Sequence, residues 1–349
     1  MTRETVRLTS LAHGGGCGCK LAPSVLTEIL AGLPLAGAFP DLMVGAETAD
    51  DAAVWRLNAD QALVATTDFF MPIVDDPFDF GRIAATNALS DVYAMGARPI
   101  LALALVGMPV AKMPVETIRA ILAGGAAVCQ AAGAPVAGGH SIDSAEPIYG
   151  LVALGLVHPE KLLLNSTAQA GDQLILGKAL GVGVLSAALK QGRLPPGGYE
   201  TLIASTTQLN AVGAELADIA AVHALTDVTG FGLIGHALEM ARGAELTISI
   251  GAAAAPLLAG VEALARAGVR TGAAGRNWES FGQAVAVAPE IPEWMRDVLC
   301  DPQTSGGLLI AVGPEGGDEV LAMLRSRGFA AAAVVGRCAQ GAPRIEVSA

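Results

Sequence analysis

Acidic side chains early in the chain are placed where they could bind a metal ion. Asp51 precedes an apolar run at 52–57, Asp68 ends a second apolar run at 62–67, and Asp91 lies in a predicted helix. If these elements are neighbours, their carboxylates converge on one volume, and hard oxygen ligands suit Mg²⁺ and a polyphosphate. Asp is also common at helix N-caps and in turns, so a structural role stays open for each.

A glycine-rich stretch at 13–20, H-G-G-G-C-G-C-K, offers thiol chemistry. Its glycines leave the sulfur of Cys17 accessible, and Lys20 and His13 could lower the pKa of that thiol and make it a nucleophile. Consecutive glycines also predict mobility, so we expect residues 1–44 to form a mobile, Gly-rich catalytic lid. The alternative is a flexible loop with incidental thiols.

Two familiar motifs do not fit this stretch. A phosphate-binding P-loop would need glycine where Cys19 stands and a hydroxyl group where Leu21 stands. Cys17 and Cys19 resemble half of a zinc site, but the other cysteines are isolated and no histidine lies at ligand spacing from them. We therefore expect neither a P-loop nor a zinc site.

Three further loops could contact a ligand. Residues 137–144, A-G-G-H-S-I-D-S, could form an anion-binding nest of backbone amides or a plain hairpin loop. Asp227 precedes a Gly-rich turn into a helix, where it could face a ligand or simply cap that helix. The stretch 301–307, D-P-Q-T-S-G-G, predicts a tight loop before a strand at 308–312.

The elements that would position these residues form an α+β pattern, with helices on one face of a sheet. The uncovered face predicts a dimer built sheet to sheet. A polar stretch at 165–172 is interpreted as a domain linker. In the first half we expect strands at 52–57, 62–67, 99–107, 135–138 and 148–157 and helices at 80–95 and 114–132. In the second half we expect a strand at 173–177 and helices at 183–190 and 199–221.

Composition limits the function. A chain of 349 residues with 52% hydrophobic content predicts two domains, which we place at 45–160 and 161–349 after the lid. A net charge of −12 argues against a nucleic-acid partner. No apolar run is long enough for a membrane helix, no signal peptide is recognisable, and five cysteines do not indicate a disulfide framework. We expect a cytoplasmic protein that does not interact with a membrane.

Several motifs together resemble one enzyme family. They are H-G-G-G-C-G-C-K at 13–20, E-T-A-D-D-A-A-V at 47–54, the stretch from T-T-D-F-F-M-P through T-N-A-L-S-D-V-Y-A-M-G at 66–96, A-G-G-H-S-I-D, N-S-T-A-Q-A-G, T-D-V-T-G-F-G-L-I-G-H and D-P-Q-T-S-G-G. In this order, and over nearly the whole chain, they are similar to selenophosphate synthetase, also called selenide, water dikinase.

The resemblance implies a fold and an activity. Family members have the aminoimidazole ribonucleotide synthetase-like fold and form homodimers whose N-terminal domains pair into a barrel, with ATP near the subunit interface. They convert selenide, ATP and water into selenophosphate, AMP and orthophosphate, using Mg²⁺ and a monovalent cation, usually K⁺. Selenophosphate supplies selenium for selenocysteine and selenouridine, and a selenium-delivery protein is a possible partner.

The resemblance also implies roles for individual residues. Cys17 matches the position that holds cysteine or selenocysteine, and Lys20 matches the lysine that contacts phosphate. Expected metal ligands are Asp51, Asp91 and Asp227. Expected nucleotide contacts are Lys20, Thr48, Ala49, Asp50, Asp68, Asp91, Gly139, His140 and Ser141. Because Cys17 and Lys20 are both present, the chain does not look like inactive paralogues that lack the cysteine.

Two other functions stay open at this point. A different ATP-using enzyme of the superfamily, acting on an amidated or thiamine-like substrate, would share the acids but would not need the Cys-Gly-Cys-Lys segment. A non-enzymatic carrier of selenium or a thiol-bound metal would use Cys17 and Cys19 and would not need the acids to converge. Mg²⁺-dependent ATP turnover and its dependence on selenide separate the three.

Overall fold

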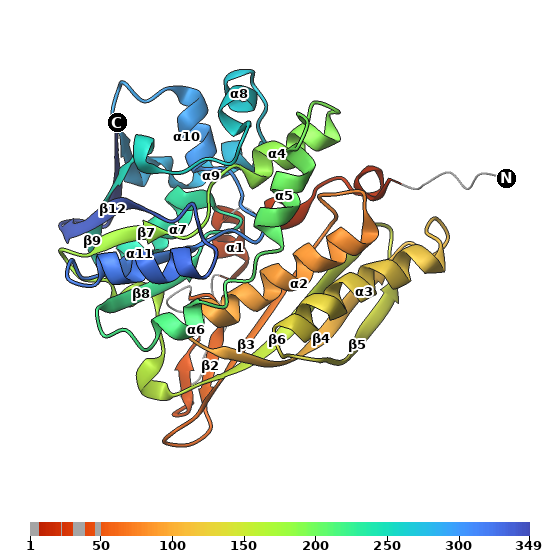
Figure 1. The fold of residues 1–349 in the computed structure, drawn as a ribbon, viewed down its shortest axis with the longest axis horizontal. Coiled ribbons are helices and arrows are strands. Elements are labelled where there is room, and N and C mark those ends of the chain that lie inside the picture. The colour runs from red at the N-terminus through yellow and green to blue at the C-terminus, as the bar shows by residue number, and fades with distance from the viewer. Residues whose placement is uncertain (1–6, 22, 31–38, 46–49) are drawn as a thin grey trace.

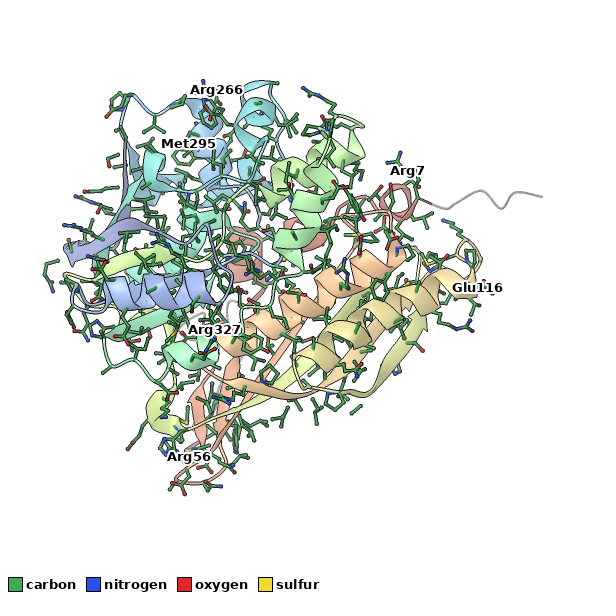
Figure 2. All side chains as sticks on the ribbon, in the orientation of Figure 1. Arg7, Arg56, Glu116, Arg266, Met295 and Arg327 are labelled. Atoms are coloured by element: carbon green, nitrogen blue, oxygen red, sulfur yellow. The ribbon has the colours of Figure 1, made fainter. Side chains whose placement is uncertain are left out.

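The structure, a computed structural model, describes residues 7–21, 23–30, 39–45 and 50–349. The protein has two β-sheets, one formed by each half of the chain, and helices pack against both (Figure 1). Charged side chains such as Arg7, Arg56 and Arg266 lie at the edge of the molecule (Figure 2). In the described residues, no helix is both long and apolar enough to cross a membrane.

The first sheet has six strands in the order β1-β2-β3-β6-β4-β5. Neighbouring strands run antiparallel except for β4 and β5, which are parallel. Its first strand lies within the range that we predicted as lid, so the sheet begins before residue 45. The strands are β1 (Leu42–Val44), β2 (Ala53–Arg56), β3 (Ala62–Phe70), β4 (Arg98–Met108), β5 (Val136–Asp143) and β6 (Ile148–Val157).

Helices α2 (Pro77–Ala94) and α3 (Val115–Ala131) cover one face of this sheet (Figure 1). Helix α2 begins where Asp76 accepts a hydrogen bond from the amide of Asp79, with Pro77 in the first turn. Almost every later residue of α2 is buried. The helix therefore fixes its polar side chains, which include Asp91, inside the protein.

The other face of the first sheet has no cover within the described chain. Large apolar side chains are exposed on its strands, among them Trp55 on β2 and Phe69 on β3, with Phe69 51% exposed. The strand pattern agrees, because Phe70 is buried under α2 while its neighbour points away. This uncovered face was expected from the sequence.

The second sheet has seven strands in the order β10-β13-β9-β12-β7-β11-β8. They are β7 (Gln173–Leu176), β8 (Val222–Asp227), β9 (Leu246–Gly251), β10 (Val285–Val287), β11 (Leu308–Val312), β12 (Ala333–Gln340) and β13 (Arg344–Ser348). The helices of this half are α4 (Val182–Lys190), α5 (Gly198–Thr206), α6 (Gly213–Leu216), α7 (Gly232–Gly243), α8 (Val261–Arg266), α9 (Gly272–Phe281), α10 (Glu293–Leu299) and α11 (Gly317–Ser326). A short helix, α1 (Pro23–Leu30), lies in the N-terminal part.

Two predicted elements are wrong. The helix expected at 199–221 is split into α5 and α6, because Asn210 lies in the break and donates hydrogen bonds to Ser90 and to the carbonyl of Gly306. The loop expected at 137–144 is mostly strand, since β5 continues to Asp143 by pairing with β4. The other predicted strands and helices exist. The strands at 148–157 and 308–312 have the predicted bounds, and the rest have shifted ends.

Candidate active site

Three carboxylates from both halves of the chain meet in one place. Asp51 lies just before β2, Asp91 lies on α2, and Asp227 is the last residue of β8. One oxygen of each lies within 4.8 Å of the others. We call these three residues the acid cluster; the sequence had placed all three in a metal site. Asp227 makes no side-chain cap to α7, so the capping alternative does not apply.

The acid cluster fits a divalent cation. Burial raises the pKa of each of the three carboxyl groups, and their mutual repulsion raises those of Asp51 and Asp91 further. One oxygen of Asp51 and one of Asp227 are buried with no hydrogen-bond partner in the described chain. Buried carboxylate oxygens rarely stay unsatisfied, and Mg²⁺ would satisfy them with the oxygen ligands that it prefers.

Hydroxyl groups hold the cluster in position. Thr66 donates to Asp91 at 2.6 Å and Thr226 donates to Asp51 at 2.9 Å. The Ser90 hydroxyl accepts a hydrogen bond from Asn210 at 2.8 Å, and the same hydroxyl lowers the pKa of Asp227 against the effect of burial. The roles of Thr226, Ser90 and Asn210 were not predicted from the sequence, although Ser90 and Thr226 each adjoin a predicted ligand.

Lys20, Asp68 and Asn87 form a second polar group beside the acid cluster. The ammonium group of Lys20 lies 3.4 Å from Asp68, whose charge raises the pKa of the lysine. Asn87 donates to the same carboxylate at 2.8 Å. Because Asn87 and Asp91 lie four residues apart on α2, they share one helix face, as the spacing predicted. Lys20 therefore remains cationic next to the acids.

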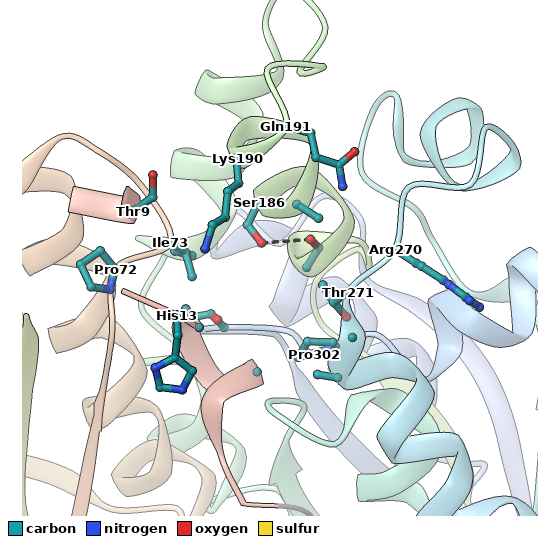
Figure 3. Close-up of a pocket in the computed structure, with 18 of the residues that line it drawn as sticks. Thr9, His13, Pro72, Ile73, Ser186, Lys190, Gln191, Arg270, Thr271 and Pro302 are labelled. Carbon is teal, nitrogen blue, oxygen red and sulfur yellow. Dashed lines mark hydrogen bonds between the residues drawn. The ribbon is translucent and has the colours of Figure 1, made fainter. Parts of the chain in front are cut away.

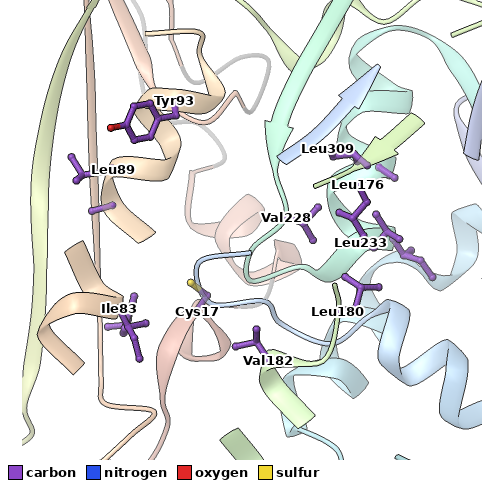
Figure 4. Packing of buried hydrophobic residues seen from close by; sticks show 14 of the residues in the cluster. Cys17, Ile83, Leu89, Tyr93, Leu176, Leu180, Val182, Val228, Leu233 and Leu309 are labelled. Carbon is purple, nitrogen blue, oxygen red and sulfur yellow. The ribbon is translucent and has the colours of Figure 1, made fainter. Parts of the chain in front are cut away.

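The Cys17 thiol is not accessible, which corrects our expectation. Its side chain is 1% exposed and lies between α2, near Ile83, and the second half, near Val182 and Val228 (Figure 4). The sulfur donates to the Asn87 carbonyl oxygen at 3.1 Å. Burial, and then the charge of Asp68, raise the pKa of the thiol, outweighing Lys20.

His13 does not assist the thiol either. Its ring lies 2.8 Å from the Glu146 carboxylate. The predicted lowering of the Cys17 pKa is therefore wrong for this conformation. The prediction was wrong because the glycines indicate a flexible backbone but do not indicate which distant residues pack over the loop.

The distant loop at 301–307 holds Cys17 in place. The amide of Cys17 donates to the Thr304 hydroxyl at 3.0 Å, and the amide of Ser305 donates to Asn87 at 2.7 Å. Ser305 adopts a positive φ of 54°. At Gly16, with φ of +55°, an added Cβ would lie 2.2 Å from the Thr304 hydroxyl, so only glycine fits there. The sequence indicated this tight loop without its contact to the thiol.

The other predicted nucleotide contacts are placed separately. Asp50 accepts from the amide of Asn165 at 2.8 Å, while Thr48 and Ala49 lie outside the described residues. Gly139, His140 and Ser141 are exposed on β5, the edge strand of the first sheet, and the structure does not bring them to the acid cluster. An edge strand leaves backbone groups free for a partner.

Comparison with known proteins gives consistent matches over both halves. The family model for the AIR synthase related protein N-terminal domain matches residues 49–157, and the model for the C-terminal domain matches 169–347. The chain is 64% identical to selenide, water dikinase of Burkholderia ambifaria, covering 98% of this chain and 97% of that one. It is 58% identical to the protein of the same name from Rhizobium meliloti, covering 98% of each.

Solved structures share the fold at lower identity. Thiamine-monophosphate kinase from Stenotrophomonas maltophilia matches with a TM-score of 0.63 and 22% identity, covering 88% of this chain and 91% of that one. Hydrogenase maturation protein HypE in complex with ATP matches with a TM-score of 0.63 and 19% identity, covering 98% and 95%. The family models and the near full-length identity show that the chain belongs to the AIR synthase related proteins and, among them, to the selenide, water dikinases.

Proposed function

We propose that the protein makes selenophosphate from selenide, ATP and water, and releases AMP and orthophosphate. The observation that supports this best is the meeting of a buried thiol, a lysine and an acid cluster at one place, in a chain at least 57% identical to proteins named selenide, water dikinase. A carrier would not need the acids to converge, and a different enzyme of the superfamily would not need the Cys-Gly-Cys-Lys segment at 17–20.

The acid cluster is proposed to hold Mg²⁺ through Asp51, Asp91 and Asp227. When bound there, the ion supplies positive charge that offsets the triphosphate. Thr66 and Thr226 keep Asp91 and Asp51 oriented, because each donates a hydrogen bond to one of these carboxylates. The Ser90 hydroxyl favours the ionised form of Asp227. One oxygen of Asp51 and one of Asp227 have no hydrogen-bond partner in the part of the chain that the structure describes, so they are available as ligands.

Lys20 is proposed to stabilise the charge on the transferred phosphoryl group. Asp68 keeps it protonated and orients it from 3.4 Å. Selenide attacks the γ-phosphorus in line and ADP leaves; water then cleaves ADP to AMP and orthophosphate. Cys17 guards or positions selenide beside Asn87, and its burial excludes competing water. We propose that the N-terminal segment opens to admit substrates.

We propose that the nucleotide contacts come from two subunits. We propose that Thr48, Ala49 and Asp50 contact ATP from their own subunit. Gly139, His140 and Ser141 would reach the ATP of a partner subunit, since they lie on the exposed edge strand β5. The uncovered apolar face of the first sheet supports a homodimer whose sheets pair into a barrel. Activation by K⁺ and a selenium-delivery protein are part of the same proposal.

Phosphorus NMR tests the reaction. Purified protein is incubated with ATP, Mg²⁺, K⁺ and anaerobic selenide, beside Cys17→Ala and a Na⁺ control. A selenophosphate resonance with AMP and orthophosphate, absent in Cys17→Ala, is expected. Selenophosphate formed equally by the variant would remove Cys17 from the mechanism. ATP consumption by the wild type without selenophosphate would contradict the substrate.

A further inference from the structure

A separate cavity lies behind the Cys17 segment, which we define as residues 12–20. It has a volume of about 340 Å³ and is bordered by this segment, by Pro72 and Ile73 after β3, by α4 and by the start of α9 (Figure 3). Volumes of this order are typical of small-molecule sites. Among the described residues, none of the predicted catalytic, nucleotide-binding or metal-binding residues lines it, although His13 and Thr304 do.

Positive charge dominates this cavity. Lys190 and Arg276 line it, and in the described chain neither is paired with a carboxylate; they donate only to the carbonyls of Ala12, at 3.3 Å, and Gly18, at 2.9 Å. Arg270 also lines it but pairs with Asp297 at 3.1 Å. The lining contains no Asp or Glu. We call it the cationic cavity.

Backbone amides add to the positive electrostatic potential of the cationic cavity. Helix α9 begins at the cavity wall, where Gly272 and Ala273 contribute to the lining. Thr271 caps the amide of Ala274, while those of Gly272 and Ala273 donate to no acceptor within the described residues. First-turn amides favour anions. By contrast, the first turn of α4 is already satisfied by Asp301 and Gln303.

The Cys17 segment is the wall between this cavity and the active site. Gly14, Gly15 and Gly18 face the cationic cavity. Cys17 and Lys20 border another cavity, of about 360 Å³, together with Asp68. The Thr304 hydroxyl that accepts from the Cys17 amide lines the cationic cavity as well. The same segment therefore borders both cavities, with Gly14, Gly15 and Gly18 lining one and Cys17 and Lys20 lining the other.

We propose that the cationic cavity binds hydrogenselenide before it reaches Cys17. The proposal rests on the function proposed above, in which selenide is the substrate. Hydrogen selenide is ionised at neutral pH, and an anion is repelled from the nucleotide side by the acid cluster, Asp68 and the triphosphate. The cationic cavity attracts it on the opposite side of the same segment.

Ser186 offers a test that leaves the segment contacts in place. It lines the cavity, and within the described residues its hydroxyl donates only to the Gly183 carbonyl, at 2.9 Å (Figure 3). Ser186→Asp adds a negative charge, and Ser186→Asn is its uncharged match. We expect Ser186→Asp to raise KM for selenide about tenfold, with kcat and KM for ATP unchanged, and Ser186→Asn to resemble the wild type.

Equal KM values for selenide in the two variants would overturn the proposal, as would a fall in kcat alone. If Ser186→Asp does not fold, Ala187→Glu against Ala187→Gln makes the same comparison at the neighbouring lining residue. Bromide, a spherical monovalent anion, gives a readout that needs no activity. We expect an anomalous peak between Lys190 and Arg276 in bromide-soaked crystals, and competition with selenide.

These results separate the two proposals. Selenophosphate synthesis by the wild type with no charge effect at Ser186 or Ala187 would remove the cavity from the pathway and leave the function intact. No selenophosphate synthesis, with bromide bound in the cavity, would overturn the function and hence the assignment to hydrogenselenide. Absence of bromide from the soaked cavity would contradict the anion site itself.

Discussion

The chain contains two kinds of buried carboxylate, and they differ in what surrounds them. Asp301, in the loop that holds Cys17, is fully buried and accepts hydrogen bonds from the amide of Val184 at 3.0 Å, from Thr271 at 3.2 Å and from Gln303 at 3.2 Å. In the acid cluster, by contrast, Asp51 and Asp227 each keep one buried oxygen that has no hydrogen-bond partner among the described residues.

The difference shows that burial alone does not mark a functional acid. Burial raises the pKa of Asp301, to about 7, just as it raises those of the acid cluster. The two kinds of acid differ in whether their oxygens accept hydrogen bonds. The surroundings of Asp301 provide donors on several sides, whereas the acid cluster brings like charges together and leaves oxygens without a donor among the described residues. The first arrangement stabilises a loop; the second provides sites for a ligand.

The largest effect is expected in the cluster, from Asp227→Asn. Removing one charge from a preorganised site should lower selenide-dependent kcat by about 10²–10³-fold. The metal-free variant should unfold at the same or a higher temperature than the wild type, because repulsion within the cluster is relieved. Steady-state kinetics and thermal unfolding in chelator check this. If Asp227→Asn were active but unstable, Asp227 would have the same structural role as Asp301, and the proposed difference between the two acids would be wrong.

For Asp301→Asn we expect the opposite result, a loss of stability with substrate binding unchanged. The side-chain amide carries two hydrogens where the protonated carboxyl group carries one, so at least one of them points at neighbours that are themselves donors. About 2–3 kcal/mol of the free energy of unfolding should therefore be lost. Denaturant unfolding at about pH 6 measures it. At a temperature where the variant is folded, KM for ATP should match the wild type. A change in that KM without loss of stability would instead give Asp301 a role in the site.

Mg²⁺ should distinguish the two regions by a smaller effect. A ligand present at about 10 times its Kd stabilises the folded protein by about 1.4 kcal/mol. We expect Mg²⁺ to raise the unfolding temperature of the wild type and of Asp301→Asn but not of Asp227→Asn. Calorimetry with and without Mg²⁺ makes the comparison, with Na⁺ matched in ionic strength. An equal shift in all three proteins would place the ion elsewhere.

The smallest effect is the pH dependence of Asp301 itself. Its folded pKa of about 7 lies above the unfolded value of about 3.9, so the folded state holds the proton more tightly, and stability falls as pH rises between these values. The advantage of the wild type over Asp301→Asn in unfolding temperature should therefore narrow from about pH 5 to about pH 8. The acid cluster titrates in both proteins and cancels in the difference. If the difference in unfolding temperature widened instead, the hydrogen-bond donors around Asp301 would lower its pKa by more than burial raises it.

The sequence allowed much of this to be predicted, for identifiable reasons. Apolar runs and glycine or proline boundaries located most strands and helices of the first sheet. The acids of the cluster could be named because each adjoins an apolar element and matches a family motif. The buried state of Cys17 could not be predicted, because it depends on Thr304 and Asn87, which approach it only in the folded chain. The break before α6 was missed because its cause is the distant partner Ser90 of Asn210.

The hydrogen bond between Cys17 and Thr304 also has a consequence during translation. Its two residues are separated by 287 positions, so the ribosome must add that stretch before the bond can form. At bacterial and eukaryotic elongation rates of about 5–20 residues per second, this takes on the order of tens of seconds. Throughout that interval the nascent chain carries the Cys17 thiol without its final cover. The thiol is then most open to oxidants and to stray metal ions, and it becomes protected only when synthesis is nearly complete.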